Sequence, residues 1–232
     1  VKVAANSFLA TKISFINAMA EVCEAAGGDV TVLAKAIGYD PRIGNRFLQA
    51  GIGFGGGCLP KDIRAFMARA QELGADQALE FLREIDAINL RARQRVIDVV
   101  RADLSEDLTL YKIAVLGATF KPDSDDVRDS PALAIALLAQ SAGANVVVHD
   151  PVALHGVSLK HPELTVQQDL NKAFDSVDAV VLATEWKEYR ELDPTTVSVA
   201  NKLIIDGRNV LDVAKWQRAG FRVLALGKTI TN

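Results

Sequence analysis

The chain has 232 residues, of which half are hydrophobic and 24% are charged, a composition typical of a globular protein with one large or two modest domains. Its formal net charge of -3 argues against a protein that binds nucleic acids or anionic membranes through its overall charge. No apolar run reaches the length of a membrane span and no signal peptide is visible, so a cytoplasmic protein is expected.

Cysteine and histidine are used sparingly. The two cysteines, Cys23 and Cys58, lie far apart in unlike surroundings, so a disulfide framework is not expected and a reducing compartment fits better. His149, His155 and His161 fall in one region without the spacing of metal ligands. We therefore assign no metal.

The first part of the chain has helical periodicity. Apolar residues from Val3 to Cys23 recur at helical spacing and predict a helix over 2–26, which Gly27 and Gly28 end. Cys23 lies on this apolar stripe, which predicts core packing for it. A shorter helix is expected over 30–37, followed by a loop over 39–57.

Residues 76–104 form an unusually long helical pattern. A helix of this length often spans two domains or lines a dimer seam. The alternative is two helices with an unmarked break near Ala87. Within this segment Asn89 and Arg93 are interpreted only as solvated or packed side chains. A boundary is expected at 105–107.

From Lys112 onward the periodicity changes to short apolar runs of the buried-strand type. Alternating strands and helices with short links predict a doubly wound parallel sheet. The fold class is therefore α/β, with an all-helical region over 1–104 followed by a Rossmann-like domain over 105–232. The expected strands are 112–117, 145–149, 179–183, 202–205 and 222–226, and the expected helices are 130–142, 170–174 and 209–218.

A glycine-dense loop precedes Cys58. Glycines let a backbone approach a ligand closely, and Pro60 suits the first turn of a helix that would begin just after the cysteine. Helix N-termini and nearby cations favour the thiolate form of a cysteine, which is the nucleophile. An inert buried cysteine is the alternative, but the glycines together with Lys61 and Asp62 favour a functional loop.

The loops after the predicted strands lie where ligands of such sheets bind. The first strand ends without a G-x-G-x-x-G fingerprint, so a dinucleotide cradle is not supported there. Lys121, Arg128 and Arg208 follow strand ends and suit a diphosphate, although solvated surface charge is an equal alternative. Asp150 is interpreted as a turn former and Trp186 as packing on the sheet rim.

With these residues assembled, the chain resembles the UDP-glucose 6-dehydrogenase family, and within it the bacterial enzymes. The resemblance covers essentially the whole chain. One departure is Gly57, where many members carry Ser. Another is the family's N-terminal glycine fingerprint for NAD, which is absent here, so the chain is expected to be the central and C-terminal portions and to be inactive alone. The matching motifs are 2–15, Phe47 to Asp62, Phe120 to Ser130, 184–186 and 206–209.

The resemblance implies oxidation of UDP-glucose to UDP-glucuronate with two NAD⁺. Cys58 resembles the nucleophile that forms a thiohemiacetal and then a thioester, which water hydrolyses. Lys2 looks like the lysine that stabilises the oxyanion. Asp62 and Asn6 look like the residues that position water and assist proton transfer.

Binding roles follow the same resemblance. The implied cofactor contacts are Lys61 and Arg128. Arg42 resembles an arginine that one subunit of a dimer supplies to the site of the other. A homodimer through the 76–104 helix is expected. The alternatives are a UDP-N-acetylmannosamine or GDP-mannose dehydrogenase, or a non-catalytic nucleotide-sugar-binding and dimerisation module. The implied substrate contacts are Arg42, Phe47, Gln49, Gly51, Gly53, Phe54, Gly55, Phe120, Lys121 and Arg208.

Overall fold

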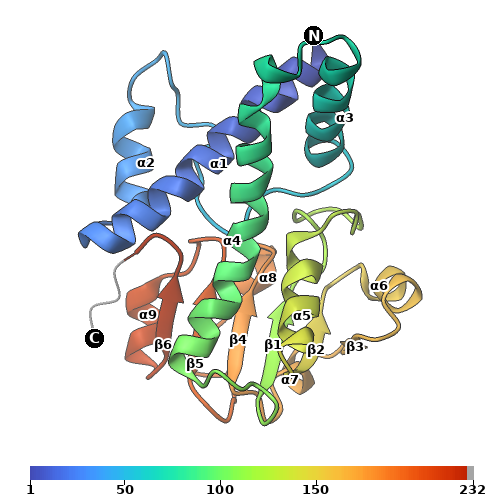
Figure 1. The fold of residues 1–232 in the computed structure, drawn as a ribbon. Coiled ribbons are helices and arrows are strands. Elements are labelled where there is room, and N and C mark those ends of the chain that lie inside the picture. Colours follow the sequence, from blue (N-terminus) through green and yellow to red (C-terminus); the bar gives the residue numbers. More distant parts are fainter. Residues whose placement is uncertain (229–232) are drawn as a thin grey trace.

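Helices come first along the chain and a parallel sheet follows, and the two units lie one above the other in Figure 1. The computed structural model describes residues 1–228. The helical unit contains α1 (Lys2–Ala26), α2 (Val30–Gly38), α3 (Leu59–Glu72), the 3-10 turn η1 (Asp76–Leu79) and α4 (Phe81–Asp103). The sheet unit contains β1 (Lys112–Leu116), α5 (Pro131–Ser141), β2 (Asn145–His149), α6 (Leu154–Lys160), β3 (Thr165–Val166), α7 (Leu170–Ala173), β4 (Ala179–Leu182), α8 (Lys187–Arg190), β5 (Leu203–Asp206), α9 (Val213–Arg218) and β6 (Arg222–Ala225).

The six strands pair in the order β3-β2-β1-β4-β5-β6, and every pair is parallel. The order reverses between β1 and β4, which is the switch point where ligands of doubly wound sheets bind. The register aligns Ile113 of β1 with Val146 on one side and Ala179 on the other. This arrangement confirms the predicted doubly wound fold.

Helices cover both faces of the sheet. Apolar side chains of α4, α5 and α6 form one core with the sheet, and those of α7, α8 and α9 form the other. Helix α4 belongs to two cores: Leu82 packs with the helical unit, whereas Val96 and Val100 pack on the sheet. The long helix therefore fixes the helical unit onto the sheet, and a domain boundary at 104/105 stays a prediction.

Several predicted helix ends are confirmed. Gly27 caps α1 with φ 75°, in the left-handed region that favours glycine. Ser130 caps α5, where its hydroxyl accepts a hydrogen bond from the Leu133 N–H. Cys23 is buried in the core between α1 and α2, as its place on the apolar stripe predicted.

Other expectations need correction. Helix α4 runs unbroken through Ala87, and the break lies near Glu80, where a 3-10 turn replaces the predicted first turn. The helix expected over 209–218 begins only at Val213, because Asn209 has φ 56° and Asp212 is the cap. Helices α6 and α8 and strand β3 were not predicted, since none is longer than two helical turns or two strand residues.

The described residues 1–228 include no helix that is long and apolar enough to cross a membrane. Within the same range there is no group of three or more His, Cys, Asp or Glu side chains that could hold a metal ion. Cys23 and Cys58 are both free thiols.

Candidate functional site

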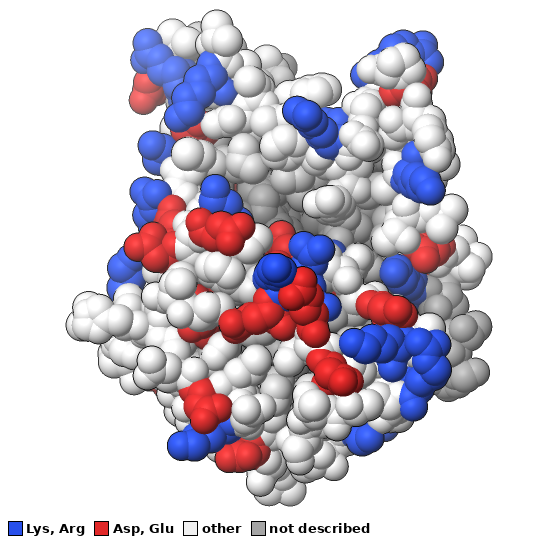
Figure 2. Space-filling view, turned by 180° about the vertical axis from the view of Figure 1, so that it is seen from behind, with Lys and Arg blue, Asp and Glu red and all other residues white. Residues whose placement is uncertain are grey.

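A cavity of about 1080 Å³ lies between the helical unit and the carboxyl ends of the strands. Figure 2 shows the hollow from behind, between two projecting parts of the molecule with Lys and Arg side chains on both. Its volume lies just above the range of roughly 300–1,000 Å³ for small-molecule sites. The side chains and backbone that line it are those of Ile13, Asn45, Arg46, Phe47, Gln49, Ala50, Gly51, Gly53, Phe54, Gly55, Leu59, Phe120, Lys121, Pro122, Glu185, Arg190, Arg208, Asn209 and Val210.

One side of the cavity, here called the glycine wall, consists of Gly51, Gly53, Phe54 and Gly55. It has no helix or strand, yet hydrogen bonds from distant residues hold its backbone. The Gly51 N–H donates to Asn17 Oδ1 at 2.9 Å, and the neighbouring Ile52 N–H donates to the Gly207 carbonyl at 3.0 Å. The Asn209 amide donates to the Ala50 carbonyl at 3.2 Å.

The glycine wall also touches the β1–α5 loop, residues 117–130. A Cβ at Gly55 would lie 2.1 Å from the Asp129 carbonyl oxygen, so only glycine fits there. A Cβ at Gly57 would lie 2.5 Å from Cζ of Arg128, whose guanidinium therefore fills the space of a serine side chain. The Gly56 N–H donates to the Arg128 carbonyl at 2.9 Å.

Lys2, Asn6 and Asp62 meet at the starts of α1 and α3, and Cys58 lies one helical turn before Asp62. These four residues are here called the Cys58 corner. Cys58 is the exposed N-cap of α3, and the Asp62 N–H donates to its carbonyl at 2.9 Å. Asn6 Nδ2 donates to Asp62 Oδ2 at 2.7 Å, and Lys2 Nζ lies 3.4 Å from the same oxygen. The hydrogen bond from Asn6 and the charge of Lys2 lower the pKa of the buried Asp62 carboxyl, against the effect of its burial.

Cys58 stands at the edge of the cavity. Its neighbour Leu59 lines the cavity, whereas Cys58 itself does not. Lys61 is exposed on the first turn of α3. The structure thus joins Lys2, Asn6 and Asp62 one helical turn from Cys58, beside the cavity that is lined by all the predicted substrate contacts except Arg42.

The opposite side, here called the cationic wall, consists of Phe120, Lys121, Arg190 and Arg208. Arg208 Nε donates to the Ala183 carbonyl at 2.7 Å and Nη1 to the Gly53 carbonyl at 3.3 Å, so this side chain also joins the two walls. Its Nη2 is buried and has no hydrogen-bond partner among residues 1–228. Lys121 Nζ lies 5.4 Å from the centre of the Phe120 ring and makes no ion pair within the described residues.

Glu185 balances part of this charge. Its carboxylate lies 3.2 Å from Arg208 Nε. Burial lowers the pKa of Arg208, and the charge of Glu185 opposes that effect. Three cationic wall side chains against one carboxylate leave an excess of positive charge, which suits a diphosphate.

Two family models match this chain: the UDP-glucose/GDP-mannose dehydrogenase family central domain over residues 1–91, and the UDP-binding domain of the same family over residues 114–213. The chain belongs to the UDP-glucose/GDP-mannose dehydrogenase family. The first matched region covers most of the helical unit with the Cys58 corner, and the second covers most of the sheet unit with the whole cationic wall.

Individual relatives agree with this membership. The chain is 41% identical to the UDP-glucose 6-dehydrogenase of Rickettsia conorii, over 99% of this chain and 54% of that protein. The structure matches a UDP-glucose dehydrogenase from Pyrobaculum islandicum with a TM-score of 0.86 at 33% identity, covering 99% and 50% of the two chains. A UDP-D-ManNAc dehydrogenase from Pyrococcus horikoshii matches with a TM-score of 0.80 at 27% identity, covering 98% and 51%. The chain spans about half the length of the relatives it matches.

Of the substrate contacts that the resemblance to this dehydrogenase family implied, all but Arg42 line the cavity. Arg42 is exposed and forms a bidentate ion pair with Asp40, and it does not line the cavity. Five polar residues of the cavity were not predicted as substrate contacts: Asn45, Arg46, Glu185, Arg190 and Asn209. Glu185 and Asn209 lie within matching motifs and Arg46 directly precedes one, which was the available signal.

The sheet of this family member does not itself fit a dinucleotide. The Asp150 carboxylate accepts hydrogen bonds from the N–H groups of Ala118 at 2.7 Å and Thr119 at 3.3 Å, and from the Trp186 indole at 3.1 Å. These are the N–H groups that a pyrophosphate would need in a dinucleotide-binding turn. The structure confirms Asp150 as a turn former and Trp186 as a packed residue.

Lys61 and Arg128, the two implied cofactor contacts, are both exposed on the Cys58 side of the molecule. Arg128 is paired with Asp126, from Nη2 to Oδ2 at 2.6 Å. That guanidinium lowers the pKa of Asp126 to about 2, and the carboxylate raises the pKa of Arg128. The pair is therefore ionised at any physiological pH.

Proposed function

We propose that this chain forms the UDP-sugar-binding and cysteine-bearing half of a UDP-glucose 6-dehydrogenase. The observation that carries the proposal is the Cys58 corner beside a cavity with one glycine wall and one cationic wall. The similarity to UDP-glucose dehydrogenases over nearly the whole chain supports this substrate. A non-catalytic module would not need a lysine, an asparagine and a buried carboxylate beside an exposed thiol.

The cationic wall would hold the diphosphate of UDP-glucose, and the glycine wall would direct its sugar toward Cys58. As the aldehyde forms, the Cys58 thiolate adds to its carbonyl carbon and the carbonyl electrons move to oxygen. Lys2 would stabilise that negative charge. After oxidation to the thioester, water held by Asp62 and Asn6 attacks the acyl carbon, and the carbon–sulfur bond breaks to release the acid and the thiol.

Both oxidations need a hydride acceptor, for which we propose NAD⁺. The described sheet does not fit a dinucleotide, so this chain would supply only edge contacts through Lys61 and Arg128. The matched relatives are about twice as long as this chain. We therefore expect residues 1–232 alone to form no NADH from UDP-glucose and NAD⁺, and any steady NADH formation would contradict this.

We also propose that a second copy covers the exposed face of α1. Phe8, Phe15 and Val22 recur every seven residues on this helix and are 68%, 46% and 55% exposed, and Leu90 of α4 is 45% exposed. The seam would thus involve α1 as well as the long helix, and Arg42 would serve the partner's cavity. Phe15→Glu should give a monomer by light scattering, with Val152→Glu as an exposed control.

Calorimetry with the whole chain tests the substrate. UDP-glucose should bind with one site per chain and more tightly than UDP-N-acetylmannosamine or GDP-mannose. Tighter binding of one of the other two nucleotide sugars would indicate that it, and not UDP-glucose, is the substrate. No binding of any of the three, by a chain that is folded by circular dichroism, would contradict the proposed function.

A further inference from the structure

Two polar residues on the buried side of α4 are not used by the chemistry above. Asn89 is 0% exposed and Arg93 is 5% exposed. Burying an amide and a guanidinium destabilises a protein unless both are hydrogen-bonded. Their hydrogen bonds therefore indicate what these side chains do.

Both side chains bind the backbone of Phe54 in the glycine wall. The Phe54 N–H donates to Asn89 Oδ1 at 2.7 Å, and Asn89 Nδ2 donates to the Phe54 carbonyl at 3.1 Å. Arg93 Nη2 donates to the same carbonyl at 3.0 Å. Gly53 allows this contact, because a Cβ there would lie 2.3 Å from Asn89 Oδ1.

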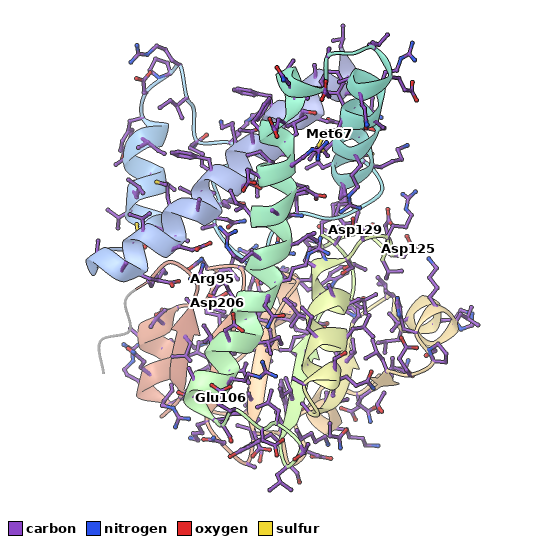
Figure 3. All side chains as sticks on the ribbon, in the orientation of Figure 1. Met67, Arg95, Glu106, Asp125, Asp129 and Asp206 are labelled. Atoms are coloured by element: carbon purple, nitrogen blue, oxygen red, sulfur yellow. The ribbon has the colours of Figure 1, made fainter. Side chains whose placement is uncertain are left out.

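Arg93 also reaches the loop that carries Phe120 and Lys121. Its Nη1 lies 3.0 Å from Oδ1 of Asp129, whose other oxygen lies 3.3 Å from Arg64 of α3. Asp129 has φ 45°, in the left-handed region, and its carbonyl oxygen is the atom that faces Gly55. In Figure 3, Asp129 lies beside α4, between α3 and α5. One guanidinium thus joins the glycine wall to the loop behind the cationic wall.

We propose that Asn89 and Arg93 are positioning residues for the sugar half of the ligand. They fix the Phe54 peptide, so that the glycine wall keeps a set distance from the cationic wall and from Cys58. The inference rests on the proposed function, because it needs a nucleotide sugar in the cavity. The cationic wall alone can hold the diphosphate, so loosening the glycine wall weakens sugar recognition more than UDP recognition.

Two conservative variants test this. Asn89→Asp keeps the acceptor for the Phe54 N–H but turns an oxygen toward the Phe54 carbonyl. Arg93→Lys keeps the charge but cannot bind the carbonyl and Asp129 as the planar guanidinium does. Matched controls on the same helix are Gln94→Glu and Arg91→Lys. The Gln94 amide donates to Asp98 one turn along the helix, and Arg91 pairs with Glu21 at the surface.

Calorimetry with UDP and with UDP-glucose, on folded protein of the whole chain, is the measurement. In both variants UDP-glucose should bind roughly tenfold more weakly, while UDP stays within about twofold and the controls match wild type. Equal weakening of both ligands, or no weakening, would overturn the inference. If Asn89→Asp does not fold, the affinities of Arg93→Lys for UDP and UDP-glucose test the inference by themselves. Wild-type protein that binds UDP but not UDP-glucose would instead refute the proposed function.

Discussion

The two walls of the cavity are built in opposite ways. The glycine wall has no regular structure, and side chains from α1 and α4 and from the β5–α9 segment hold its backbone over long sequence separations. The middle of the β1–α5 loop, residues 120–127, carries Phe120 and Lys121 of the cationic wall and is shaped by short-range bonds, such as the Asp126 N–H to Ser124 Oγ at 3.1 Å, and Lys121 is exposed. One wall thus provides a fixed shape and the other provides charge.

The largest effect is expected where the fixed wall has no free space. Gly55→Ala places a methyl group against the Asp129 carbonyl and against Pro131 Cδ, 2.6 Å away. Overpacking of this kind costs about 1–3 kcal/mol, and we expect UDP-glucose binding to be lost because the wall must move. Thermal unfolding and calorimetry check this.

The matched control is Gly156→Ala on α6, where a Cβ meets nothing within 4 Å. It should bind UDP-glucose like the wild type. Normal binding by Gly55→Ala would mean that the glycine wall is not held in place as its contacts indicate.

On the cationic wall the effect should be smaller and electrostatic. Lys121→Ala removes one exposed cation, and we expect about tenfold weaker UDP binding, with a reduced dependence on salt. Lys172→Ala, an exposed lysine on α7, is the control and should change neither. Unchanged UDP affinity in Lys121→Ala would remove this residue from the site.

The buried His149, which is hydrogen-bonded to the start of the β1–α5 loop, is expected to make the free energy of unfolding depend on pH. His149 is buried, its carbonyl accepts from the Gly117 N–H at 2.7 Å, and its Nδ1 lies 2.6 Å from the Tyr189 hydroxyl. Burial lowers the pKa of His149, so the histidine binds a proton more readily in the unfolded chain than in the folded chain. The free energy of unfolding should fall as pH drops below about 6.5.

His149→Gln should flatten that fall, measured by urea denaturation from pH 7 to 5. An equally steep fall in the variant would mean that another group titrates. Glu188, whose carboxylate lies 3.9 Å from His149 Nδ1, and Asp150 and Asp169, whose charges oppose the lowering of the His149 pKa, should be probed next.

The smallest effect is expected for Asp126→Asn, which removes the partner of Arg128. Arg128 is exposed to solvent, so the loss of the pair should lower the free energy of unfolding only slightly. Because the pKa of Asp126 is about 2, its contribution is complete above about pH 4 and is lost only as pH falls toward 2. The difference from wild type should thus be constant from pH 7 to 5, and a change across that range would contradict the assignment.

The predicted elements show what periodicity can and cannot reveal. The apolar runs predicted β1 and β2 closely, because buried parallel strands have no polar face. Strand β3 has two residues and α8 has one turn, too few for any period to appear. The cavity residues beside or within the matching motifs, such as Arg46 and Glu185, depended on tertiary contacts that sequence does not display.

Asn89 was a missed signal of another kind. It continues the buried stripe of α4 that includes Ile85, Ala92 and Val96, all of them buried. A polar residue on such a stripe must have a hydrogen-bond partner. The sequence could therefore have indicated that Asn89 hydrogen-bonds another part of the chain. It could not have shown that this partner is the backbone of Phe54, 35 residues earlier.

The central claim is that Cys58 faces the ligand held by the two walls. Alkylation by iodoacetamide, with each thiol followed by mass spectrometry, tests it directly, and the buried Cys23 provides an internal control. Saturating UDP-glucose should slow modification of Cys58 strongly, UDP should slow it less, and Cys23 should not change. Modification of Cys58 at the same rate with and without UDP-glucose, under conditions where calorimetry shows the sugar bound, would contradict the account.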